Sequence, residues 1–183
     1  MDARRDALVA GARLVLAVRE AAGDERSRAT VGAIAVRPAI PTAVPGECEL
    51  TVDQRHPDAR TLAAMVSEVH DVAATIAVED RVEIDFERIW SIDPIAFDEE
   101  LVDLAEEVTR EVTGTSARLF SGALHDAAAV AAIGVPTVML FVQSAGGISH
   151  AREEDTAPEH LEAAVVTLAR LTDRVIERAT PRG

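Results

Sequence analysis

Apolar residues recur every three or four positions in several stretches of the chain, and this spacing predicts helices. The first covers residues 4–22 and ends at Gly23-Asp24. Two more cover 59–77 and 98–112, a short Ala-rich helix ends at Ala132, and the last covers 158–178. The long helices keep their apolar residues on one face, as helices that cover a core do.

Alternation of apolar and polar residues predicts strands. In residues 47–55, Cys48, Leu50 and Val52 face one side while acidic and polar residues face the other. Residues 81–90 alternate in the same way, and 29–36 form a third apolar strand. Two further strands are predicted over 117–120 and over the almost wholly apolar segment 136–142.

The order of these elements divides the chain into two parts joined by a linker at 93–97. Residues 1–92 read helix–strand–strand–helix–strand, an α+β layer that resembles a ferredoxin-like split β-α-β motif without its first strand. Residues 93–183 alternate strands with helices, which predicts an α/β arrangement with a parallel sheet. The apolar strand 136–142 needs neighbours on both edges and has only one short partner. Because the first part also lacks its first strand, we expect both parts to be incomplete.

Composition narrows the classes of function. The chain has 183 residues, 48% of them hydrophobic, and a net charge of −14. An acidic chain without a basic stripe is not expected to bind nucleic acid. A single cysteine allows no internal disulfide and fits a reducing cytoplasm. No stretch reaches the roughly 18–20 apolar residues of a membrane helix, so no membrane partner is expected.

Candidate chemistry lies where the two strands of the second part end. His125 and Asp126 follow the first of these strands, and His150 follows the second. Gly146 and Gly147 allow the backbone to approach a ligand closely. A histidine at a strand exit suits metal binding or proton transfer, and a solvated loop explains it equally well.

Arg55 is a third candidate, at the end of the alternating strand 47–55. Its planar guanidinium could bind a carboxylate with two hydrogen bonds. The simpler interpretation from these residues alone is a surface arginine paired with Asp53 or Asp58.

Three segments together resemble a known family: RRDALVAGARLVLAVRE, VPGECELTVDQRHPD and SGALHDAAAVAAIGVPTVMLFVQSAGGISHAREEDT. They are similar to the hydantoinase/carbamoylase group of di-zinc amidohydrolases, within the aminoacylase-like metallopeptidases. That group includes N-carbamoyl-L-amino-acid hydrolases, β-ureidopropionases and allantoate amidohydrolases. The similarity covers nearly the whole chain, in the family's order.

The resemblance implies a lid domain, which forms a homodimer, in residues 1–92 and the closing part of a zinc-peptidase-like α/β catalytic domain in 93–183. It implies hydrolysis of a ureido or amide C–N bond, with two divalent metals (Zn, Mn or Co) that activate a water. By resemblance His150 is a metal ligand, and Arg55 reaches the substrate carboxylate in the partner subunit's active site. His125, Gly146 and Gly147 match residues on the substrate side of the pocket.

The chain also departs from the family. Thr42 stands where the family usually has an asparagine that holds substrate, and Leu124 stands beside His125 where a glycine is common. The family's other metal ligands and its catalytic glutamate have no counterpart here, so we expect no catalytic residue in this chain and no activity from it alone. The alternatives are a fragment of a related metallo-dipeptidase or deacylase, which Thr42 favours, and a non-catalytic dimerising or binding remnant.

Overall fold

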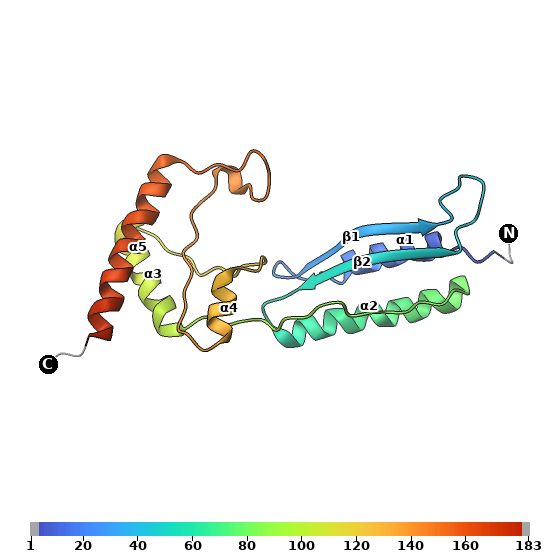
Figure 1. Ribbon diagram of the computed structural model, residues 1–183, viewed down its shortest axis with the longest axis horizontal. Helices are drawn as coiled ribbons and strands as arrows, with labels where there is room; N and C mark the ends of the chain where they lie inside the picture. Colours follow the sequence, from blue (N-terminus) through green and yellow to red (C-terminus); the bar gives the residue numbers. More distant parts are fainter. Residues whose placement is uncertain (1–3, 181–183) are drawn as a thin grey trace. The chain divides into compact units, whose positions relative to one another are not determined.

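The computed structural model describes residues 4–180, and the chain divides into two compact units, one up to Pro94 and one from Ile95. The first unit holds α1 (Ala7–Glu20), β1 (Arg28–Arg37), β2 (Glu47–Arg55) and α2 (Ala59–Asp80) (Figure 1). The second holds α3 (Glu99–Thr113), α4 (Asp126–Ala132), the short 3-10 helix η1 (Ala145–Gly147) and α5 (Pro158–Ala179). Each unit is described by itself.

The first unit is an antiparallel hairpin with two helices packed against it. β1 and β2 pair from Arg28 opposite Arg55 to Arg37 opposite Glu47. The register shifts between Val31 and Ala33, so β1 carries one extra residue there, as in a β-bulge. The expected alternation in β2 is confirmed, because its apolar residues are half-buried and its first acidic residues are exposed.

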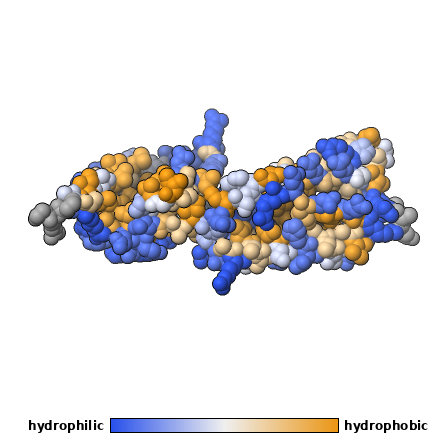
Figure 2. Space-filling view, turned by 60° about the horizontal axis from the view of Figure 1, so that its bottom comes forward, coloured by the Kyte–Doolittle hydropathy of each residue, from blue (hydrophilic) through white to orange (hydrophobic). Residues whose placement is uncertain are grey.

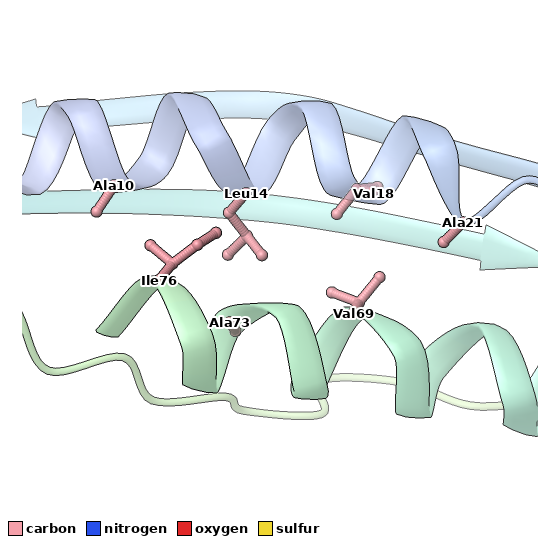
Figure 3. Packing of buried hydrophobic residues seen from close by; sticks show 7 residues of the cluster. All are labelled: Ala10, Leu14, Val18, Ala21, Val69, Ala73 and Ile76. Carbon is pink, nitrogen blue, oxygen red and sulfur yellow. The ribbon is translucent and has the colours of Figure 1, made fainter. Parts of the chain in front are cut away.

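Helix α1 begins where Asp6 caps it. The Asp6 carboxylate accepts hydrogen bonds from the backbone N–H of Leu8 and Val9, both at 3.2 Å. Burial is the largest single influence on the Asp6 carboxyl and raises its pKa. The hydrogen bonds and Arg4 together outweigh burial, so the pKa of Asp6 is lowered. The buried face of α1 meets that of α2 in the core cluster of Figure 3, which comprises Ala10, Leu14, Val18, Ala21, Val69, Ala73 and Ile76.

Helix α2 is capped by Asp58, whose carboxylate accepts from the backbone N–H of Thr61 at 2.8 Å. At its other end Arg13 of α1 donates to Glu79 and, at 2.8 Å, to Asp80. By length and composition α2 could cross a membrane, a test that core helices of soluble proteins also pass. Its apolar face is occupied by α1 and the hairpin, which indicates a core helix.

Helix α1 lies very close to β2 at Gly11. A Cβ built at Gly11 would lie 2.5 Å from Cys48 Sγ, closer than atoms can pack. Burial there also raises the pKa of the Cys48 thiol. The glycine therefore has a packing reason, although glycine in a helix costs about 1 kcal/mol relative to alanine.

We expect the effect of Gly11→Ala on stability to depend on residue 48. In the wild-type background, overpacking of ~1–3 kcal/mol opposes the helix gain, so Gly11→Ala is neutral or destabilising. In a Cys48→Ala background the clash is removed, and Gly11→Ala stabilises by about 1 kcal/mol. A double-mutant cycle by urea denaturation measures this coupling. Equal effects in both backgrounds would contradict the close contact.

The strand predicted over 81–90 is not a strand in the structure. Val82 and Ile84 pack against the core while Glu83 and Asp85 are exposed, so the alternation is partly realised. Among the described residues, however, only β1 and β2 pair, and the chain after α2 has no ladder of its own. The prediction was wrong because alternation reports which side chains are buried, whereas a strand also needs a hydrogen-bonded neighbour.

The second unit is built on the pairing of α3 and α5. Its buried cluster consists of Leu104, Ala105 and Val108 from α3 and Leu171 from α5. Beside the cluster, Arg174 of α5 donates to two acidic residues of α3, Glu107 and Glu111, at 2.7 Å each. These two hydrogen bonds raise the pKa of the Arg174 guanidinium.

The parallel sheet expected in this unit is not formed by the described residues, because 117–120 and 136–142 are not strands and join no sheet there. Val138 and Leu140 lie against the α3–α5 cluster, which accounts for their apolar character. Arg118 binds the first segment to α3 through Glu99 at 3.2 Å, Asp103 and Glu106 at 2.8 Å. The mixed helix-and-sheet class is confirmed, and the ferredoxin-like lid stays a prediction.

Large apolar side chains remain at the surface of both units (Figure 2). In the first unit Trp90 is 61% exposed, and in the second Val165 is 68% exposed. Others are Ile89, Leu119, Ile133, Leu161 and Leu168. Several of these lie in or beside the segments for which strands were predicted. Large apolar side chains gathered at a surface are typical of faces that another part of a protein covers.

Candidate functional site

Arg55 ends β2 and is half exposed, as the sequence predicted for a residue on the polar face. Its Nε donates to Asp53 Oδ1 at 2.6 Å and its Nη2 to Asp53 Oδ2 at 3.1 Å. This two-point contact raises the pKa of the guanidinium, so Arg55 is always a cation. The pairing with Asp53 that the simpler interpretation expected is therefore present, and it also orients the guanidinium plane.

Thr42 lies in the loop between β1 and β2, at the opposite end of the hairpin from Arg55 (Figure 1). The Gly46 N–H donates to the Arg37 carbonyl at 2.9 Å and closes this loop, and Thr42 is exposed on it. A strand advances about 3.3 Å per residue, so the length of β2 separates the two ends by roughly 25 Å. One chain does not bring Thr42 and Arg55 to the same ligand.

His56 follows Arg55 and is almost fully buried, with 3% of its side chain exposed. Its Nδ1 accepts from the Asp58 N–H at 2.9 Å, and its Nε2 lies 3.3 Å from Asp24 Oδ2. His56 was not among the site residues predicted from the sequence. Its contact with Asp24 spans 32 residues of sequence, so no local pattern identifies it.

In the second unit, Gly146, Gly147 and His150 lie in one loop with unusual backbone angles. Gly146 has φ = 64° and Gly147 φ = 70°, in the left-handed region that favours glycine. His150 has φ = 58°, which is uncommon for any residue with a side chain. The loop base is closed by the Ala145 N–H, which donates to the Asp155 carbonyl at 2.7 Å.

The backbone of His150 is held by an acid of the same loop. The His150 N–H donates to Glu154 Oε2 at 2.7 Å, while the His150 side chain is exposed. A left-handed histidine costs of order 1–3 kcal/mol, and such residues concentrate at functional sites. The loop therefore fixes the direction in which His150 leaves the backbone and leaves its imidazole accessible.

His125 stands immediately before α4 with extended backbone angles, φ = −124° and ψ = 157°. Its side chain makes no capping hydrogen bond and is exposed. The expected convergence of His125 with His150 depended on two neighbouring strands, which do not pair. Within residues 4–180, no hydrogen bond or ion pair joins the two histidines, and Figure 1 draws α4 well apart from η1.

A complete metal centre is not present among the described residues. No group of three or more His, Cys, Asp or Glu side chains is placed to hold a metal ion there. Glu154, an acid of the same loop, already accepts from the His150 backbone. Zinc takes three or four protein ligands. The donors within residues 4–180 therefore do not by themselves fit a zinc site, and His150 can offer at most one ligand.

Two known amidohydrolases are similar in sequence to most of this chain. Allantoate amidohydrolase of Bacillus subtilis is 30% identical to this chain over 173 residues, which are 93% of this chain and 42% of that protein. N-carbamoyl-L-amino-acid amidohydrolase of Rhizobium meliloti is 32% identical over 161 residues, 87% of this chain and 38% of that protein. The chain thus spans about two fifths of the length of these relatives.

A solved structure of a related amidase is also similar to this chain. A hydantoinase/carbamoylase family amidase from Burkholderia multivorans is 38% identical, with a TM-score of 0.84 over 93% of this chain and 42% of that one. Enzymes of this kind are generally metal-dependent. The family model described as peptidase family M20/M25/M40 matches residues 5–174. The resemblance noted in the sequence is thereby confirmed, and the chain belongs to peptidase family M20/M25/M40.

Proposed function

We propose that this chain is the C-terminal portion of a metal-dependent amidohydrolase that cleaves a ureido or amide C–N bond of small N-carbamoyl-amino-acid-like substrates. The observation that carries the proposal is the alignment of nearly the whole chain with relatives named as allantoate and N-carbamoyl-amino-acid amidohydrolases. The fixed backbone and accessible imidazole of His150 support it from the structure.

Each unit has a role in this proposal. Residues 1–92 are the lid, through which two copies associate, and residues 93–183 are the closing part of the catalytic domain. His150 supplies one ligand to a divalent metal, and the remaining ligands and the catalytic glutamate come from residues outside this chain. Arg55 binds the substrate carboxylate, while His125, Gly146, Gly147 and Thr42 line the substrate side. The single half-buried cysteine, Cys48, is compatible with a cytoplasmic location.

The exposed apolar residues support a missing covering part. Trp90 and Val165 lie on different units, and both are more than half exposed. Residues 82–90 and 136–142 belong to no sheet among the described residues, so no strand ladder uses their backbone N–H and C=O groups. Strand edges of this kind pair readily with other strands. An N-terminal part that adds strands beside both segments would satisfy these groups and cover the apolar surface.

Activity with and without an N-terminal part tests the proposal. The purified chain is expected to hydrolyse no N-carbamoyl-L-amino acid, allantoate or ureidoglycolate, with or without Zn²⁺, Mn²⁺ or Co²⁺, because its donor set is incomplete. Joined in frame to the N-terminal part of the Rhizobium meliloti relative, it is expected to gain metal-dependent turnover. Product release is followed as ammonia or free amino acid.

Three outcomes separate the alternatives. Clear metal-dependent turnover by the isolated chain would contradict the need for further ligands. Turnover by the fusion of dipeptides or N-acyl amino acids only would favour the dipeptidase or deacylase reading. A well-folded fusion inactive on every substrate, together with a stable dimer of the isolated chain in light scattering, would favour the non-catalytic remnant.

A further inference from the structure

His56 belongs to no helix or strand, yet it joins three parts of the first unit. It lies between the last residue of β2, Arg55, and the cap of α2, Asp58. Its other neighbour, Asp24, comes from the turn between α1 and β1. With 3% of its side chain exposed, the imidazole is buried, and buried polar groups are kept for the bonds they make.

The hydrogen bonds determine which ring nitrogen carries the proton. A backbone N–H can only donate, so the 2.9 Å contact from the Asp58 N–H makes Nδ1 an acceptor. The neutral ring then carries its proton on Nε2, which donates to Asp24 Oδ2 at 3.3 Å. Nδ1 also lies 3.2 Å from the Asp58 carbonyl oxygen, and the shorter N–H contact decides the assignment.

Asp24 is itself fixed. Its Oδ1 accepts from the Arg26 N–H at 2.9 Å, from the Ser27 N–H at 2.7 Å and from Ser27 Oγ at 2.8 Å. These bonds, led by the Ser27 hydroxyl, lower the pKa of Asp24 and keep it ionised. The carboxylate is therefore a strong acceptor, held at the start of β1 and directed at the buried imidazole.

Arg55 lies between these fixed points. Across the hairpin it pairs with Arg28, the first residue of β1 and the residue after Ser27. Along the chain it precedes His56, whose ring is tied to Asp24 and to the Asp58 backbone. The backbone of Arg55 is thus held on its strand side by the ladder and on its exit side by the imidazole.

We propose that His56 is a positioning residue, which through Asp24 fixes the end of β2 so that the Arg55 guanidinium is held where it meets a substrate carboxylate. The inference rests on the proposed function for the role of Arg55. It goes beyond the proposed function because the support of Arg55 is assigned to a buried imidazole that touches no substrate.

The first experiment uses the chain itself and measures the order of the Arg55 side chain. The heteronuclear NOE of the Arg55 Nε–Hε group is recorded by NMR in wild type, His56→Ala, His56→Gln and Asp24→Ala. We expect His56→Ala and Asp24→Ala each to lower this NOE measurably, although the contact of Arg55 with Asp53 remains, and a His56→Ala/Asp24→Ala double variant to lower it no further than either single change. The glutamine amide can still donate to Asp24, so His56→Gln should restore part of the order.

His70→Ala is the matched control, because His70 is an exposed histidine of the same unit that stacks on Phe86 instead. It should leave the Arg55 signal unchanged. Circular dichroism melting of every variant identifies any that fail to fold, and in that case Asp24→Ala and His56→Gln decide the result. An Arg55 NOE that stays at the wild-type value in folded His56→Ala or Asp24→Ala would overturn the proposal.

The second experiment uses the active fusion. Because only the placement of a binding group is disturbed, His56→Ala should raise the KM for an N-carbamoyl-amino acid roughly tenfold and leave kcat within about twofold. An unchanged KM in an active fusion would overturn the role of His56 while the proposed function stands. An inactive wild-type fusion, with the NMR effect present, would instead contradict the proposed function and leave the anchoring of Arg55 in place.

Discussion

His150→Ala in the active fusion is expected to lower kcat/KM by about a thousandfold. In the proposed enzyme His150 is one of the few ligands of a metal ion, and the charge stabilisation that such an ion provides is worth several kcal/mol. Alanine removes the ligand, although the left-handed backbone at φ = 58° favours glycine, asparagine and histidine over alanine. Steady-state kinetics at saturating metal measure the loss.

Metal content distinguishes a ligand from a residue that only shapes the loop. Bound metal per chain, measured by plasma mass spectrometry, should fall in His150→Ala and stay at the wild-type value in the control His160→Ala, a histidine in the first turn of α5. Glu154→Gln keeps an acceptor for the His150 N–H, so it should retain most activity. Full metal content and near-normal turnover in His150→Ala would show that the imidazole is not a ligand.

The helices of this chain could be predicted closely from the sequence, because their signals are local. The apolar residues of α2 and α5 repeat with the helical period, and Asp58 and Pro158 mark where the two helices begin. The hairpin was also predictable, since the alternation in 47–55 and the proline-rich loop before it are local features. For these elements the sequence pattern and the structure differ by only a few residues at the ends.

The strands over 81–90, 117–120 and 136–142 were not predictable in the same way. Their apolar positions report burial, and Val82, Ile84, Val138 and Leu140 are indeed packed against helices. Pairing depends on a neighbour elsewhere in the fold, and none of the described residues supplies one. The joint placement of His125 and His150 failed for the same reason, because it was inferred from strands that do not pair.

The features of the candidate site also fall into those with a local sequence signal and those that depend on distant contacts. The positive φ of Gly146 and Gly147 follows from residue type, and the pairing of Arg55 with Asp53 follows from their spacing in β2. His56 was missed because its importance lies in a contact with Asp24, 32 residues earlier in the chain. A contact of that range has no local signal, and only the packing of the α1–β1 turn against the β2–α2 junction reveals it.

Arg55→Ala is expected to raise the KM of the active fusion for carboxylate substrates by about 10- to 100-fold. A hydrogen bond to a charged group contributes about 1.5–3 kcal/mol, and ~1.4 kcal/mol is a factor of ten. Arg55→Lys should recover little, because an ammonium lacks the planar two-point geometry. Arg28→Ala is the matched control, since Arg28 is the arginine opposite Arg55 in the register of the hairpin. A normal KM in Arg55→Ala would contradict the assignment.

Mixing two impaired variants, assayed at a substrate concentration well below KM where each alone has little activity, determines which active site Arg55 serves. If the lid pairs two copies and Arg55 of each reaches the other's site, a dimer of one Arg55→Ala chain and one His150→Ala chain contains one intact site, built from His150 of the first and Arg55 of the second. Random exchange makes half of the dimers mixed, so about a quarter of the wild-type activity should return under two-fold symmetry. If Arg55 serves its own chain's site, no mixed dimer has an intact site and activity stays at the level of the separate variants. Recovery near a quarter would therefore establish both the dimer and the shared site, and its absence from demonstrably mixed dimers would confine Arg55 to its own subunit.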